Sequence, residues 1–296
     1  MARLPRADDR PAPGVRRHGR QRRALHGRGR RLARPRPARV LAPPLTGPSP
    51  PPLRVLRLVV SYDGTAYAGW QVQPAAATVQ GALAAAARDL LGPGVGVTGA
   101  SRTDAGVHAL RQVVSLSTRS ALAPERVLGA LNAALPADIR VMAAAEARPG
   151  FDARRAAVAK RYLYLVDNGA VANPLLRRYA WHVRRPLDVA AMRVAAGALV
   201  GRHDFSAFRA AAGRGAFPVC RVRALHVLRR DDRVAVLVSA DRFLHHMVRN
   251  IVGSLVAVGR GAREPGWLAA VLAGRDRTRA GATAPAHGLT LVRVVY

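Results

Sequence analysis

The residues best suited to chemistry lie in the run 99–109, which reads GASRTDAGVHA. Asp104 stands near its centre, with Arg102 two residues before it and Ala-Gly directly after it. Because the residues that follow are small, backbone and ligand can approach the carboxylate closely in a tight loop. A carboxylate placed in this way can act as a nucleophile or as an electrostatic anchor. The alternative is a surface turn, since Asp-x-Gly is common in turns.

A second polar group interrupts an apolar stretch near the C-terminus. The apolar pattern there predicts a long helix from Asp241 to about Val258. On such a helix, His245 and Arg249 are four residues apart and share one face. An arginine on an apolar helix is partly buried and needs a carboxylate or phosphate partner, for which Asp104 is the obvious candidate. The alternative is that Arg249 extends into solvent.

The adjacent His245 and His246 raise the question of a metal site. Neighbouring residues on a helix point about 100° apart, so we expect that these two side chains do not chelate one ion. No third ligand set is evident in the sequence. The single cysteine, Cys220, also excludes a cysteine cluster and an intramolecular disulfide. We therefore expect no metal site.

Two tyrosines share one face of a predicted strand. Residues 158–166 alternate strictly, which places Tyr162 and Tyr164 on the same side. They either pack in the core with their hydroxyls at the rim, or form a platform for a base or a proton-handling phenol. The alternation does not choose between the two tyrosines. Farther on, the small and basic residues 211–215 suit a loop that contacts phosphate, or a solvated connector.

The elements that position these residues alternate along the chain from Leu53. Short turns join several strand pairs, which predicts a sheet that is at least partly antiparallel. The pattern is that of an α+β fold built from two similar halves rather than a doubly wound one. Strands are expected at 53–61, 95–98, 111–117, 138–142, 158–166, 222–229, 233–239 and 289–295. Helices are expected from Thr78 to Gly92, from Pro124 to Pro136, from Asp188 to Gly201, at 241–258 and at 267–272.

Composition points to a polyanionic partner. The 296 residues carry a net charge of +31, and all but one of the 48 basic residues are arginine. Such a surface attracts polyanions, and arginine stacks on bases and holds phosphate in a bidentate way. The sequence contains no apolar run of transmembrane length and no apolar signal-peptide core, so we expect a cytoplasmic protein.

Residues 1–52 differ from the rest of the chain. They contain fourteen arginines and two aspartates, are rich in proline and show no sustained periodicity. This composition predicts a disordered extension. The segment is either a basic RNA-contacting arm or an extension without a role, and the abrupt start of fold-like sequence at Leu53 favours the second.

Residues 53–296 resemble the tRNA pseudouridine synthase A family. The segments that carry the resemblance occur in family order: Tyr62-Asp63-Gly64-Thr65, Gly69-Trp70-Gln71, residues 101–109, Phe151-Asp152-Ala153-Arg154, residues 160–164, Asp204-Phe205-Ser206, residues 243–253 and Gly288-Leu289-Thr290-Leu291. Two positions depart from the family pattern. The family usually has glycine where Ser101 stands, and Phe-Ser where Arg155-Ala156 stands.

The resemblance implies a fold and an activity. The implied fold has two similar α/β subdomains, residues 53–155 and 156–296. They form one largely antiparallel sheet flanked by helices, with the active-site cleft between them. The implied activity is isomerisation of uridine to pseudouridine at positions 38–40 of the tRNA anticodon stem-loop. It involves no redox change and no net hydrolysis, so it needs no cofactor. The family acts as a homodimer.

The same resemblance assigns roles to four residues. Asp104 becomes the catalytic carboxylate and nucleophile, and Arg249 stabilises its ionised form. Tyr162 stacks on the target base, and Arg102 helps to extrude the uridine. Two other readings remain: a non-catalytic RNA-binding protein that uses the same positive surface, and a hydrolase with an aspartate nucleophile, which would require a water-activating base or a metal near Asp104.

Overall fold

The computed structural model describes residues 51–210 and 217–296. The predicted extension 1–52, apart from its last two residues, and the predicted phosphate-contact loop 211–215 lie outside the described residues. In the described part of the chain, no helix is both long and apolar enough to cross a membrane.

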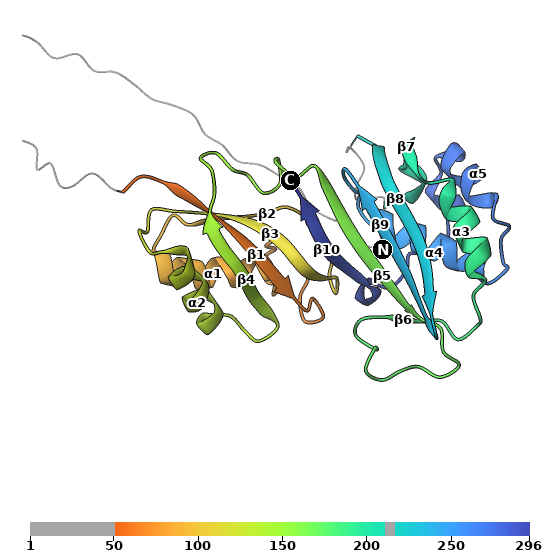
Figure 1. Ribbon diagram of the computed structural model, residues 1–296, viewed down its shortest axis with the longest axis horizontal. Coiled ribbons are helices and arrows are strands. Elements are labelled where there is room, and N and C mark those ends of the chain that lie inside the picture. Colours follow the sequence, from red (N-terminus) through yellow and green to blue (C-terminus); the bar gives the residue numbers. More distant parts are fainter. Residues whose placement is uncertain (1–50, 211–216) are drawn as a thin grey trace, which may run out of the picture. The chain divides into compact units, whose positions relative to one another are not determined.

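One sheet of ten strands forms the centre of the described residues (Figure 1). The strands are β1 (Arg54–Tyr62), β2 (Gly96–Gly99), β3 (His108–Thr118), β4 (Ile139–Glu146), β5 (Ala159–Asp167), β6 (Trp181–His182), β7 (Gly201–Asp204), β8 (Val219–Arg230), β9 (Arg233–Ala240) and β10 (Leu289–Val295). Their order is β4-β1-β3-β10-β5-β9-β8-β7, with β2 paired to β3 and β6 to β5. Among these pairs, β10–β3 and β5–β6 are parallel and the others antiparallel. The predicted α+β class and largely antiparallel sheet are confirmed.

Strand β10 joins the two halves of the sheet. It pairs with β3 on one side and with β5 on the other, although it is the last strand in the sequence. The register places Leu291 opposite Ala109 on β3 and opposite Tyr162 on β5. Strand β3, which follows the loop with Asp104, and strand β5, which carries Tyr162, are thereby held at a fixed separation. The proposed subdomain boundary between residues 155 and 156 stays a prediction.

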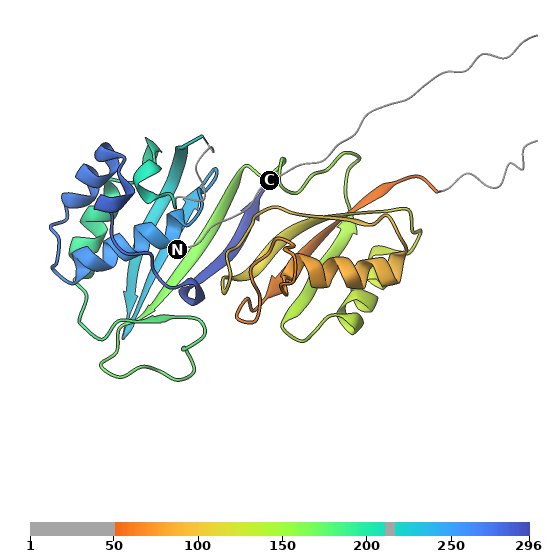
Figure 2. The ribbon, with the colours of Figure 1, turned by 180° about the vertical axis from the view of Figure 1, so that it is seen from behind.

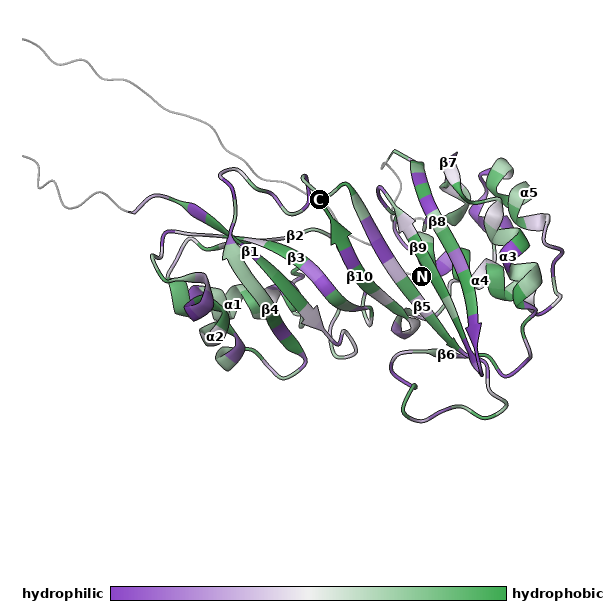
Figure 3. Ribbon diagram, viewed as in Figure 1, coloured by the Kyte–Doolittle hydropathy of each residue, from purple (hydrophilic) through white to green (hydrophobic). Residues whose placement is uncertain are grey.

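Helices cover the sheet. They are α1 (Val79–Leu91), α2 (Pro124–Ala134), α3 (Val189–Gly197), α4 (Met247–Gly259) and α5 (Trp267–Gly274). Figure 1 draws the strands in front of α1 and α4, and Figure 2, seen from behind, draws both helices in front, so they lie on the same face. Helix α2 packs on β4, and α3 packs on both α4 and β8. Hydrophobic residues run along the central strands, with hydrophilic residues at intervals between them (Figure 3).

Local signals set most helix ends. The Thr78 side chain accepts a hydrogen bond from the backbone of Gly81, and Gly92 ends α1, as the sequence predicts. Pro124 opens α2, where its missing N–H costs no helical bond. Asp188 caps α3 as predicted, but the predicted stop at Gly201 is wrong, because α3 ends four residues earlier and Gly201 begins β7.

The predicted start of the long helix at Asp241 is also wrong, because α4 begins at Met247. The Asp241 carboxylate accepts the backbone N–H groups of Arg221 and Arg242, so it holds the end of β9 against β8 instead of capping a helix. His246 then adopts a left-handed conformation, with φ of 59°. A left-handed residue interrupts a right-handed helix, and residues 241–246 therefore form an irregular connection that ends in a turn.

Candidate active site

A cavity of about 910 Å³ lies beside the loop that carries Asp104. Its walls come from segments far apart in the sequence: the loop 100–107, strand β5, residues 241–246 and the first turn of α4. The four predicted site residues all line it: Arg102, Asp104, Tyr162 and Arg249. The fold thus brings together residues that are up to 147 positions apart.

Buried hydrogen bonds hold the loop before Asp104. The backbone N–H of Trp70 donates to the Thr103 carbonyl at 3.0 Å, and the Thr103 hydroxyl lies 2.8 Å from the Tyr62 hydroxyl. The Gln112 side chain accepts from the Ser101 N–H at 3.2 Å and donates to the Ser101 carbonyl at 2.6 Å. These contacts satisfy buried polar groups and leave the loop little freedom, so the carboxylate is pre-positioned.

Two further contacts hold the loop on either side of Asp104. Gly69 has a φ of 97°, and a Cβ there would lie 2.6 Å from the Thr103 carbonyl oxygen, so only glycine permits this approach. The buried His108 accepts a hydrogen bond from the Gly64 N–H at 3.0 Å and donates to the Arg178 carbonyl at 2.8 Å. Sequence analysis assigns His108 no role, and its position in the run 99–109 is the only signal that pointed to it.

Asp104 is paired with Arg249. Arg249 Nη1 donates to Asp104 Oδ2 at 3.1 Å, and Arg249 Nε donates to the Ala284 carbonyl at 2.8 Å. The Arg249 side chain is 15% exposed and that of Asp104 is 22% exposed, so solvent screens the pair only in part. The predicted pairing is confirmed, and the alternative in which Arg249 extends into solvent is excluded.

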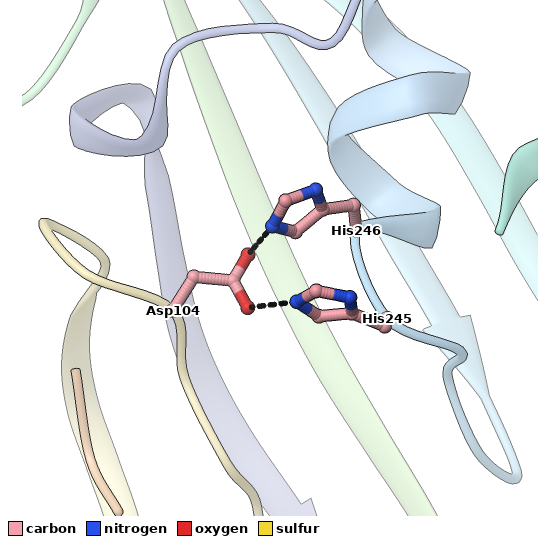
Figure 4. Close-up of side chains that lie close together, drawn as sticks. All are labelled: Asp104, His245 and His246. Carbon is pink, nitrogen blue, oxygen red and sulfur yellow. Dashed lines mark ion pairs between the residues drawn. The ribbon is translucent and has the colours of Figure 1, made fainter. Parts of the chain in front are cut away.

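Both histidines also face Asp104. His246 Nε2 lies 3.4 Å from Oδ2, and His245 Nε2 lies 3.7 Å from Oδ1. Figure 4 shows each ring directed at a different carboxylate oxygen. The two ring centroids are 4.0 Å apart, which the turn before α4 allows. Burial lowers the pKa of His246, and the Asp104 carboxylate opposes this change.

The argument that these histidines diverge on a helix is therefore wrong. Donor atoms of Asp104, His245 and His246 lie within 4.8 Å of one another, a separation that could converge on one metal ion. Two features oppose a cation there. The Arg249 guanidinium already pairs with the Oδ2 atom of Asp104. Helix α4 begins at Met247, directly after His246, and its N-terminus carries a partial positive charge.

Tyr162 also lines the cavity. It is 6% exposed, and its hydroxyl lies 2.9 Å from Ser101 Oγ. Its ring meets Phe243 edge to face, with centroids 5.1 Å apart. Burial raises the pKa of Tyr162 to about 12, the Ser101 hydrogen bond lowers it, and the Asp104 charge raises it. The phenol therefore stays protonated at neutral pH.

The structure distinguishes the two tyrosines. Tyr164 is fully buried, its hydroxyl donates to the Pro285 carbonyl, and it does not line the cavity. Sequence analysis also missed the partner of Tyr162, because Ser101 stood out only as a departure from the family pattern. Arg102 is exposed at the cavity, and within the described residues it makes no hydrogen bond or ion pair. Its guanidinium is therefore available to a ligand.

Comparisons with known proteins identify relatives of this chain. A family model described as tRNA pseudouridine synthase matches residues 58–154 and 195–296, which include Arg102, Asp104 and Arg249. Over 242 residues the chain is 47% identical to tRNA pseudouridine synthase A of Myxococcus xanthus, covering 81% of this chain and 91% of that protein. Over 243 residues it is 48% identical to the protein of that name from Moorella thermoacetica, covering 81% and 99%. The solved structure titled "Crystal Structure of a Cbf5-Nop10-Gar1 Complex" aligns with a TM-score of 0.34 and 13% identity, over 80% of this chain and 48% of that one.

Proposed function

The chain belongs to the tRNA pseudouridine synthase family, whose members are isomerases, and from this premise we propose that it converts uridine to pseudouridine at positions 38–40 of the tRNA anticodon stem-loop. One observation carries the proposal: Asp104 and Arg249 form an ion pair inside a cavity of about 910 Å³. That volume is in the range of pockets that enclose most of a small ligand. The cavity therefore has room for a flipped nucleotide.

The reaction exchanges one bond for another. The bond between ribose C1′ and uracil N1 breaks, the base turns, and C5 joins C1′, while C5 loses a hydrogen and N1 gains one. Asp104 can begin this sequence by adding to the sugar, by adding to the base, or by taking a proton so that a glycal forms. Each route needs an ionised carboxylate, which the Arg249 guanidinium stabilises.

The other side chains hold the base. In this proposal Tyr162 stacks on the uracil ring, and Phe243 fixes the tyrosine by its edge-to-face contact. Extruding a base from a stack costs a few kcal/mol. The exposed Arg102 offsets part of this cost by placing its planar guanidinium in the vacated position. His245 and His246 close the cavity on the far side of Asp104.

The proposal extends to partners and location. A net charge of +31 attracts the phosphate backbone of tRNA, and recognition rests on the shape of the folded RNA. By family resemblance the protein acts as a homodimer in the cytoplasm, with one tRNA held across both subunits. The chemistry is neither redox nor net hydrolysis, so it requires no cofactor.

The test is Asp104→Asn, a nearly isosteric change that removes the charge. Glu125→Gln, at an exposed position in α2 outside the cavity, is the matched control. Pseudouridine formation should fall at least about a thousandfold in Asp104→Asn, while affinity for tRNA stays within about twofold of wild type. The control should retain full activity.

Two outcomes would support the alternatives. A wild-type protein that binds tRNA but leaves every uridine unchanged is an RNA-binding protein without this activity. Release of free uracil from tRNA by the wild type, instead of pseudouridine, identifies a hydrolase.

A further inference from the structure

Three cations line the cavity besides Arg102 and Arg249. They are Arg154, Lys160 and Arg242. Lys160 lies on β5 directly opposite Ala240 of β9, and Arg242 follows Ala240 by two residues. The sheet register therefore brings the backbone of the lysine close to that of the second arginine. None of the three takes part in the mechanism proposed above.

Lys160 is a half-buried ammonium without a counter-ion. No hydrogen bond or ion pair involves its side chain within residues 51–210 and 217–296. Its one charged neighbour there is Arg154, which carries the same sign. Burial and this repulsion lower the pKa of Lys160 to about 8. A buried cation without a partner lowers the stability of the fold, and a ligand that supplies the opposite charge removes this cost.

The Arg242 guanidinium also lacks a negatively charged partner among the described residues. Its Nε and Nη2 atoms are shielded from solvent and have no hydrogen-bond acceptor among the described residues. The adjacent carboxylate of Asp241 already accepts two backbone N–H groups. The Arg242 side chain contacts the Cys220 thiol, and its guanidinium lies 5.3 Å from the centre of the Phe217 ring, so neither neighbour supplies a negative charge.

We propose that Lys160 and Arg242, with Arg154, form a binding site for a phosphodiester of the RNA backbone next to the target nucleotide. The inference rests on the proposed function, because it places the phosphate of a neighbouring nucleotide in the cavity that holds the target base. A phosphate has oxygens that can accept hydrogen bonds from the Lys160 ammonium and from the Arg242 guanidinium. It also neutralises the repulsion between Lys160 and Arg154.

The sequence provides a direct probe, because Lys160 is its one lysine. An amine-directed acetylating reagent can therefore modify only Lys160 and the chain's α-amino group. The experiment compares acetylation of Lys160 by peptide mass spectrometry in Asp104→Asn protein, alone and with an anticodon stem-loop RNA. We expect RNA to slow acetylation of Lys160 at least about fivefold, while the α-amino group reacts at an unchanged rate.

A modified RNA separates phosphate binding from simple shielding. The stem-loop is made with one neutral methylphosphonate in turn on each side of the target uridine. At one of these positions, protection of Lys160 should be lost. Protection that survives the methylphosphonate at both positions overturns the proposal. Equal protection by inorganic phosphate alone also overturns it, since the site would then bind a free anion.

Kinetics provide a second readout that does not depend on labelling. Lys160→Met should raise the KM for tRNA about tenfold, change kcat less than twofold, and lower the salt slope of binding by about one. Lys160→Arg keeps the charge and should restore KM. Arg126→Met, which removes an exposed charge on α2, is the matched control and should behave as wild type.

The two proposals fail in different ways. If the phosphate site is wrong, Lys160→Met has the KM and salt slope of wild type while pseudouridine still forms. If the proposed function is wrong, the wild type forms no pseudouridine, and protection of Lys160 is measured independently of turnover.

Discussion

Removal of the Arg249 guanidinium should slow catalysis by an amount that follows from the geometry. Arg249 Nη1 lies 3.1 Å from Asp104 Oδ2, and the two charge centres are roughly 4 Å apart. At an effective dielectric constant of about 20, such a pair interacts by about 4 kcal/mol. Both side chains keep some solvent exposure, so we take about half of this, roughly 2 kcal/mol. That energy corresponds to about a 30-fold loss of rate.

The assay is single-turnover formation of pseudouridine in tRNA at saturating enzyme, with Arg249→Met compared to wild type. Arg249→Lys is the matched control, because it keeps the charge and loses the hydrogen bond from Nε to the Ala284 carbonyl. It should be slowed less than Arg249→Met, by about three- to tenfold. A rate for Arg249→Met within about threefold of wild type, with unchanged affinity for tRNA, would refute an electrostatic role for Arg249.

Three more predictions concern the framework of the site. Ser101→Gly removes the 2.9 Å hydrogen bond to the Tyr162 hydroxyl and should lower the free energy of unfolding by about 1 kcal/mol in a urea titration, with activity within about threefold; unchanged stability contradicts it. Gly69→Ala places a Cβ 2.6 Å from the Thr103 carbonyl at a φ of 97° and should cost about 1–3 kcal/mol of stability; a Tm equal to that of wild type contradicts it. Because burial lowers the pKa of His246 in the folded state, the unfolded chain binds more protons below the ordinary histidine pKa of about 6.5, and stability falls as the pH decreases through that value. His246→Asn, which tolerates a left-handed backbone, should reduce this decrease in a series of Tm measurements between about pH 7.5 and 5.5, and an equal decrease in both proteins excludes His246 as its source.

Much of the secondary structure followed from local patterns in the sequence. The last strand, Leu289–Val295, has the predicted bounds, and α1 lies between the predicted cap at Thr78 and the predicted stop at Gly92. Such signals are readable because an N-cap or a terminal glycine acts within one turn of its own helix. The pairing of Asp104 with Arg249 also followed from the sequence. An arginine in an apolar helix requires an anionic partner, and Asp104 was the obvious candidate.

Tertiary contacts decided what local patterns could not. Asp241 reads as a helix cap, yet its carboxylate bonds to the backbone at Arg221, on a strand 20 residues earlier. This contact delays α4 until Met247 and leaves both histidines free to face Asp104. Alternation along the strand could not choose between Tyr162 and Tyr164. The family resemblance named Tyr162, and the structure shows that Tyr162 is the one of the two that lines the cavity.

By itself, then, the sequence determined the elements, the catalytic candidate and its guanidinium partner, because caps, alternation and the burial of a charge are properties of short segments. Only the tertiary structure decided which side chains meet around Asp104, and that Lys160 and Arg242 line the same cavity without counter-ions among the described residues. The physical reason is that strand register and loop packing join segments more than a hundred residues apart. The charges that line the cavity therefore come from segments that only the complete fold brings together.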